Sequence, residues 1–188
     1  MKKSLPLFGF CLVLLMSASL VITPRTGLAA SAAEIDSNVD AALEKLYASS
    51  PAAQELAKVA RGILVFPRVV KAGLIVGGQY GVGALRVGEQ TDGYYNTVAA
   101  SYGLQAGAQA FGYAMFFIKD SAIDYLKKSS GWEVGIGPSI VVVDAGVARS
   151  LSTTTAKEDI YVFFFDQKGL MAGLGLQGAK ISKITPEP

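Results

Sequence analysis

Four cations in a glycine-rich stretch, residues 60–88, are the side chains of this sequence with the most recognisable chemistry. They are Arg61, Arg68, Lys71 and Arg86. No acidic residue occurs between Glu55 and Glu89, so no carboxylate nearby in the sequence neutralises them. Arg presents a planar fork of donors and Lys a compact charge, and both bind phosphate oxygens. These four residues are the candidate site for an anionic ligand, with scattered, solvated surface charges as the alternative.

Catalysis and metal binding find little support among the other polar residues. The chain contains no His, and its single Cys, Cys11, lies in an apolar run near the N-terminus. This composition excludes Ser–His and Cys–His catalytic pairs and metal sites built from His or Cys. Two carboxylate pairs lack a base or nucleophile partner, and we interpret them as solvated caps. They are Asp120/Asp124 and Glu158/Asp159. We therefore expect no enzyme, no cofactor and no metal.

A glycine pattern near the C-terminus matches a nucleotide-binding fingerprint in its letters alone. Gly173–Gly178 reads GLGLQG, which fits G-x-G-x-x-G. That fingerprint binds a pyrophosphate when a helix follows it, because the helix N-terminus receives the negative charge. Only residues 179–188 follow here, and they end in Pro-Glu-Pro. We interpret these glycines as part of a curved sheet.

The N-terminal 32 residues have the three parts of a secretory signal peptide. Lys2 and Lys3 form a basic start, an apolar run covers residues 5–22, and small residues fill positions 29–33. The small-x-small rule predicts cleavage after Ala32, with Ala30 and Ala33 as alternative sites. An uncleaved anchor helix is the other interpretation, because the run approaches the ~20 residues of a membrane span. Cleavage predicts an exported protein, periplasmic or secreted and peripherally associated with a membrane.

Removal of residues 1–32 changes the charge of the chain. Lys2, Lys3 and Arg25 leave, so 17 cations become 14 against 15 acids, and the formal net charge falls from +2 to −1. The global charge therefore gives no argument for nucleic acid, and any anion must be bound by a local patch. Residues 33–188 have the length of a single domain.

Helix signals occur in three places. An amphipathic pattern that starts at Ser37 predicts a first helix, and Ser50 followed by Pro51 predicts the N-cap and first turn of a second. Asp120 is the predicted cap of a third helix over residues 121–128.

Strand signals fill most of the remaining chain. Short strands are predicted at 63–66, 73–80, 81–87 and 160–165, and others within 132–147. Residues 95–110 alternate and predict one long strand bent at a glycine. Residues 166–169 predict a hairpin turn into a strand at 170–179. The signals together predict an α+β fold, in which N-terminal helices and one further helix pack against a curved antiparallel sheet or small barrel-like core.

Six pieces of the sequence, taken in order, carry a family resemblance. They are GILVFP (62–67), KAGLIVGG (71–78), GVG (81–83), SYGLQAG (101–107), GIGP (135–138) and KGLMAGLGLQG (168–178). The ordered set resembles the SYLF lipid-binding domain and spans about residues 35–184. The resemblance implies an exported bacterial member of a family that also includes eukaryotic actin-patch regulators. It also implies binding to acidic phospholipids, which are phosphoinositides for the eukaryotic members.

The cations and the resemblance together predict a non-catalytic domain that binds anionic phospholipid head groups at a membrane surface. Arg61, Arg68, Lys71 and Arg86 are its predicted phosphate-binding residues. Two other functions are open. Alternating strands, aromatic residues and glycines also occur in transmembrane β-barrels. A sheet edge could instead bind a protein partner, as in a periplasmic interaction or scaffold domain.

Overall fold

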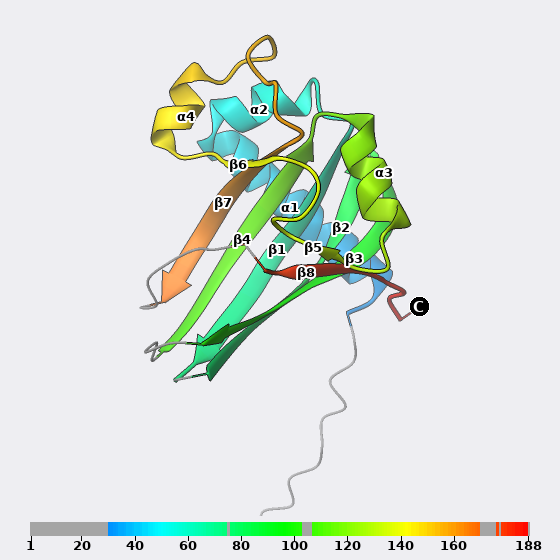
Figure 1. Cartoon of the computed structure of the whole chain (residues 1–188), viewed down its shortest axis with the longest axis vertical. Coiled ribbons are helices and arrows are strands. Elements are labelled where there is room, and N and C mark those ends of the chain that lie inside the picture. Colours follow the sequence, from blue (N-terminus) through cyan, green and yellow to red (C-terminus); the bar gives the residue numbers. More distant parts are fainter. Residues whose placement is uncertain (1–29, 75, 103–106, 170–175, 177, 188) are drawn as a thin grey trace, which may run out of the picture.

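The computed structural model describes residues 30–74, 76–102, 107–169, 176 and 178–187, whose eight strands form one sheet. The strand order is β5–β8–β3–β2–β1–β4–β7–β6, and every neighbouring pair is antiparallel except β6 and β7. The sheet curls into a half-barrel (Figure 1). Its strands are β1 (Gly62–Gly73), β2 (Val76–Val87), β3 (Gln90–Tyr102), β4 (Gly107–Phe117), β5 (Trp132–Glu133), β6 (Ile140–Val142), β7 (Ile160–Gly169) and β8 (Lys180–Ile184).

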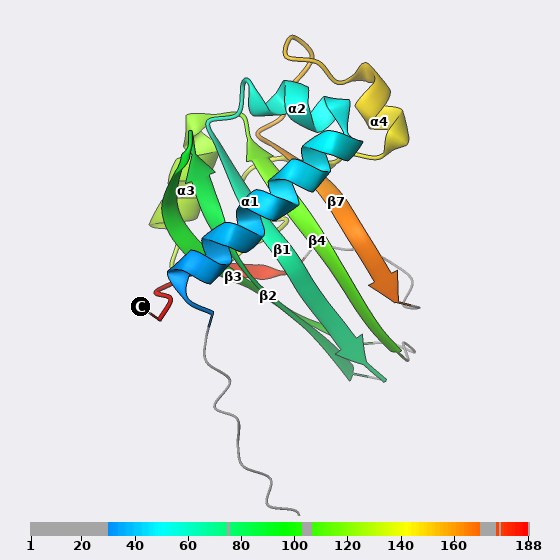
Figure 2. The same ribbon diagram turned by 180° about the vertical axis from the view of Figure 1, so that it is seen from behind.

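Four helices in the described residues pack around this sheet. They are α1 (Ala32–Ser49), α2 (Pro51–Ala57), α3 (Asp120–Lys128) and α4 (Ala145–Ser150). Helix α1 crosses the outer face of the half-barrel diagonally (Figure 2), whereas α3 and β8 lie on its inner side (Figure 1). The predicted α+β fold, with N-terminal helices on a curved antiparallel sheet, is confirmed.

The first helix begins earlier than the sequence predicted. Ser31 is its N-cap, and the Ser31 hydroxyl accepts a hydrogen bond from the backbone N–H of Glu34 at 3.3 Å. The predicted start at Ser37 was wrong because residues 31 and 32 were assigned to the signal peptide. The second prediction is confirmed, since Ser50 caps α2 and Pro51 opens it.

Several strand boundaries also differ from the prediction. The segment predicted as one strand at 73–80 contains the end of β1 and the start of β2, and β1 continues from Gly62 through a bulge between Val65 and Arg68. Pro67 lies in that bulge, where a residue without an N–H costs no ladder bond. The predicted long strand 95–110 is likewise two strands, the end of β3 and the start of β4. Alternation in both strands hid the connection between them.

Two predicted features near the C-terminus were placed differently. The predicted hairpin turn at 166–169 is part of β7, where Asp166 adopts a positive φ of 51° within a register shift against β4. The following predicted strand, 170–179, lies mostly outside the described residues. Helix α4 replaces part of the strand region predicted at 132–147, because the Asp144 carboxylate accepts bonds from the N–H groups of Gly146 and Val147.

Apolar clusters cover both faces of the sheet at one of its ends. On the outer face, α1 buries Ile35, Val39 and Leu46 against the strands. On the inner face, Tyr113, Phe117 and Trp132 belong to a second cluster. The opposite end carries the β1–β2 turn, and α1 leaves its outer face uncovered (Figure 2). We call this the open end of the sheet.

Candidate functional site

The four predicted phosphate-binding cations lie in separate surroundings. Arg61 precedes β1, at the end of the sheet opposite the open end. Its exposed guanidinium lies 3.8 Å from a carboxylate oxygen of Asp120. It therefore contacts the start of α3 and is far along the strand from Arg68 and Lys71.

Arg86 connects the sheet to α1. Its guanidinium donates to the Asp40 carboxylate at 2.6 Å, to the Asp36 backbone carbonyl at 3.2 Å and to the Thr91 hydroxyl at 2.6 Å. The Asp36 carboxylate in turn accepts bonds from Thr91 and Tyr94. The Arg86 side chain is only 12% exposed. The bonds of Arg86 therefore attach α1 to the outer face of the sheet.

Arg68 and Lys71 lie on opposite faces of β1. Arg68 is directly opposite Val82 on the outer face, whereas Lys71 is directly opposite Gln79 on the inner face. Side chains alternate along a strand, so an odd separation of three residues separates the two charges. The odd spacing of Arg68 and Lys71 in the sequence could already have predicted that they lie on opposite faces of a strand. The structure thus does not bring the four cations together, and their joint action on one ligand stays a prediction.

A contiguous apolar patch occupies the outer face of the open end. Val70, Tyr80 and Val98 are direct neighbours across β1, β2 and β3. Leu74 and Val76 lie at the adjoining β1–β2 turn. All five side chains are between 42% and 73% exposed. We call these five residues the apolar patch. Exposed apolar side chains that gather in this way mark an interaction surface, whereas scattered ones do not.

Three cations border the apolar patch. Arg68 lies two residues before Val70 on the same face, Lys180 is directly opposite Val98, and Lys168 is opposite Ala110 beside Val70. All three are exposed, and none forms an ion pair within the described part of the chain. The sequence prediction missed Lys168 and Lys180 because they lie 100 and 112 positions after Arg68, and only strand pairing places them here.

A groove of about 540 Å³ runs between the apolar patch and α1. Glu34, Ile35 and Asn38 line it from the helix, and Arg68, Val70 and Tyr80 line it from the strands. At its end the Lys45 ammonium lies 3.3 Å from the Asp166 carboxylate. The groove extends the patch toward α1 and adds polar atoms at its border.

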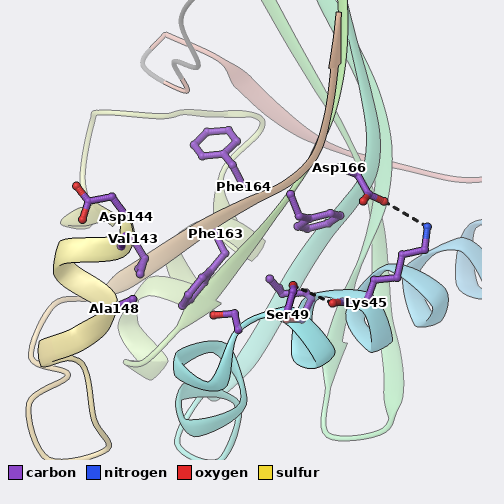
Figure 3. A pocket seen from close by; sticks show the side chains of 12 residues that line it. Lys45, Ser49, Val143, Asp144, Ala148, Phe163, Phe164 and Asp166 are labelled. Carbon is purple, nitrogen blue, oxygen red and sulfur yellow. Dashed lines mark hydrogen bonds and ion pairs between the residues drawn. The ribbon is translucent and has the colours of Figure 1, made fainter.

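A second cavity of about 500 Å³ lies beyond that ion pair, between α1, α4 and β7. Lys45 and Asp166 line it as well, together with Phe163, Val143 and Asp144 (Figure 3). The only cation in its lining, Lys45, is paired with Asp166. The second cavity therefore offers an apolar surface without an available positive charge.

Metal sites and membrane-spanning helices were also sought in the described residues. Within the described ranges, no three His, Cys, Asp or Glu side chains gather closely enough to hold a metal ion. No helix in those ranges is both long enough and apolar enough to cross a bilayer. The arrangement at the open end can bind a partner that presents apolar groups beside negative charge.

These features define an α+β half-barrel domain with a surface for association. Residues 98–186, from β3 to the end of the described chain, match the family model described as Ysc84, Las17-binding protein actin regulator. This match confirms the SYLF resemblance seen in the sequence, and it indicates a lipid- or actin-related binding domain. A comparison with curated proteins gave no match.

Proposed function

We propose that this protein is a non-catalytic, exported domain that binds the surface of membranes containing anionic phospholipids. The apolar patch meets the acyl boundary, and Arg68, Lys168 and Lys180 bind lipid phosphates around it. The observation that carries this proposal is the apolar row Val98–Tyr80–Val70. Cations that form no ion pair with a described residue border this row on both sides. The family match and the predicted signal peptide support it.

The two kinds of contact are both needed for binding. Each cation near an anionic bilayer contributes about 1 kcal/mol, so three supply roughly a hundredfold in affinity. Burial of apolar side chains adds about 25 cal/mol per Å² removed from water. A single weak signal gives only marginal and reversible association, whereas the combination gives stable attachment.

The proposal locates the binding energy in a local surface, because the net charge of the predicted mature chain is slightly negative. Small residues surround the apolar patch on the outer face, with Ala72 opposite Gly78 and Gly78 opposite Ala100. None of these three positions carries a large side chain that would hold a flat lipid surface away from Tyr80.

A head-group series tests the lipid class. The exported protein is sedimented with vesicles of phosphatidylcholine containing increasing phosphatidylglycerol. We expect binding to rise with the anionic fraction, and Arg68→Gln, Lys168→Gln and Lys180→Gln each to weaken it about fivefold. Arg61→Gln is the matched control, since it removes an exposed cation far from the patch and should leave binding unchanged. Equal binding to neutral and anionic vesicles would refute the proposed role of charge.

A protein partner at a sheet edge is the second candidate. The outer edge of β7 pairs with β6 only at residues 160–162, so Phe163–Gly169 have no strand partner among the described residues on that side. An unpaired edge is a template for an added strand. This function would be favoured if the protein captured a peptide, if proline substitutions in β7 abolished that capture, and if the protein did not bind vesicles.

A further inference from the structure

The inner face of the open end carries a polar row that the apolar patch does not use. Lys71 on β1 is directly opposite Gln79 on β2 and directly opposite Gln109 on β4. Directly opposite residues project from the same face of a sheet. An ammonium group is therefore placed between two amides on three adjacent strands, on the side of the sheet that faces away from Val70 and Tyr80. We call these three residues the inner row.

The amides of the inner row are buried but unsatisfied. Gln79 and Gln109 are each 6% exposed, yet Gln79 Nε2 and Gln109 Oε1 have no hydrogen-bond partner among the residues that the structure describes. Deeper in the half-barrel, the Thr97 hydroxyl and the Tyr113 hydroxyl are also buried, and these two groups lie close to each other. Buried polar atoms are nearly always paired, because each unpaired group costs about 1–3 kcal/mol. Unsatisfied donors and acceptors gathered on one face indicate a ligand that pairs with them.

Three glycines border the inner row on the side of the open end. Gly73 is directly opposite both Gly77 and Gly107. A Cβ at Gly73 would lie 2.4 Å from the Cα of Gly77, so this glycine allows the two strands to approach closely. A Cβ at Gly107 would meet no described heavy atom within 4 Å, so that position leaves space beside the row for a ligand.

The charge of the inner row defines the ligand class. Lys71 is half-buried and forms no ion pair with any described residue. A cation beside an N–H donor is suited to an oxyanion, whereas the Gln109 carbonyl oxygen needs a donor such as a hydroxyl group. A phosphate ester with a neighbouring hydroxyl supplies both.

We propose that the inner row is a second binding site, which takes a hydroxylated phosphate ester of the glycerol phosphate kind. The phosphate contacts the Lys71 ammonium and the Gln79 amide, and the hydroxyl donates to the Gln109 oxygen. The same group occurs in soluble esters and in lipid head groups. This site does not rest on the proposed membrane surface, because it lies on the other face of the sheet and can be tested without a bilayer.

Side-chain amide resonances provide the test. The ¹⁵N-labelled exported protein is titrated with sn-glycerol 3-phosphate, and the amide signals of Gln79 and Gln109 are followed. We expect saturable shifts of both signals, which Lys71→Met weakens about tenfold or more. Lys58→Met is the matched control, since it removes an exposed cation at the end of α2, outside the inner row and the apolar patch, and should leave the titration unchanged. Gln79→Leu provides a second loss-of-site variant should Lys71→Met fail to fold.

A second arm separates the two sources of the ligand. Monomeric short-chain phosphatidylglycerol replaces the soluble ester in the same titration. Shifts with the soluble ester assign the site to the phosphate ester alone, and shifts only with the lipid assign it to a head group carried by acyl chains. The absence of shifts in both arms, or shifts that persist in Lys71→Met and Gln79→Leu, would overturn the inner site. Tyr80→Ser distinguishes it from the membrane proposal, because that variant should lose vesicle binding and keep the amide shifts.

Discussion

Arg86 shows how the role of one cation depends on its partners in the fold. Its guanidinium is nearly buried and bonded to Asp36, Asp40 and Thr91. Removal of one partner from such a network leaves the other charges uncompensated. We expect Arg86→Met to lower the free energy of unfolding by about 2–3 kcal/mol, measured by urea denaturation. Arg61→Met should cost less than about 1 kcal/mol, because the Arg61 pair is exposed. Equal losses would contradict the structural role of Arg86.

The inner row carries an expected cost in stability. Gln79 and Gln109 hold buried polar atoms that have no partner among the described residues. Their replacement by Leu removes an unpaired group and adds apolar burial, so each variant should be more stable by about 1 kcal/mol. Thermal unfolding of Gln79→Leu and Gln109→Leu checks this expectation. A loss of stability in both variants would mean that the amides are satisfied in the folded protein.

Sequence reasoning identified the cations at this scale but could not assign their roles. Residues 60–88 contain no acidic residue, but this does not mean that their cations lack acidic partners in the folded protein. The acids that neutralise Arg86 come from α1, 46 and 50 positions earlier. Contacts over such separations depend on how α1 crosses the sheet, which no local pattern encodes.

At the scale of elements, Asp159 adds side-chain contacts to the short ladder that joins β6 to β7. The Asp159 carboxylate accepts bonds from the Lys119 ammonium at 2.6 Å and from the Ser139 backbone N–H at 2.8 Å. The Lys119 bond is the main cause that lowers the pKa of Asp159, followed by the Ser139 bond. A lowered pKa contributes stability above the unfolded value of about 3.9, and this contribution is lost as the pH falls through the folded value.

Asp159→Asn tests this pH dependence. We expect the variant to be less stable than the original protein at pH 7, where the carboxylate is ionised. The difference should shrink as the pH is lowered to about 2, because the original carboxylate becomes increasingly protonated as the pH falls toward its folded pKa. Urea denaturation at the two pH values measures the difference. A gap that stays constant between them would show that ionisation of Asp159 does not stabilise the attachment of β6.

The start of α1 bears on the processing of the N-terminus. Ser31 caps the helix, so cleavage after Ala30 keeps the cap and the predicted cleavage after Ala32 removes it. We therefore expect the exported protein to begin at Ser31, as intact-mass analysis would show. Ser31→Ala should then cost about 1 kcal/mol, whereas Ser37→Ala, in the helix interior, should change stability little. A mature chain that begins after Ser31 would contradict this expectation.

Helices and strands were predicted where the signal is local. Ser50 and Pro51 located α2, and β-branched residues located most strands. The boundaries failed where one pattern continues across a connection, as in residues 95–110. The turn from β1 to β2 and the bulge at Pro67 are set by strand pairing, and a sequence period does not report pairing.

At the scale of the whole molecule, the half-barrel separates two surfaces by one layer of strands. The outer face of the open end is apolar and bordered by cations, and the inner face is polar. The fold class could be predicted because glycine and β-branched residues recur in the segments that form strands. The open end could not, because it arises from the diagonal path of α1 and from the register that aligns Val70, Tyr80 and Val98.

Salt should weaken the association with anionic vesicles. Exposed charges are screened over about 10 Å at 0.1 M salt and about 3 Å at 1 M. We expect the affinity for phosphatidylglycerol vesicles to fall at least tenfold between these conditions. A residual, salt-resistant binding should remain from the apolar patch, and Tyr80→Ser should remove it. Binding that does not respond to salt would leave Arg68, Lys168 and Lys180 without a role.

Co-sedimentation of Tyr80→Ser and Val142→Ser with phosphatidylglycerol vesicles tests the central claim most directly. Tyr80 lies at the centre of the apolar patch, and Val142 is a comparably exposed side chain, at 49%, on β6 away from it. Loss of the Tyr80 ring from the acyl boundary should weaken binding about tenfold or more, with both variants folded by circular dichroism. Val142→Ser should bind like the unaltered protein. Equal binding by the two variants would contradict the assignment of the open end as the membrane-binding surface.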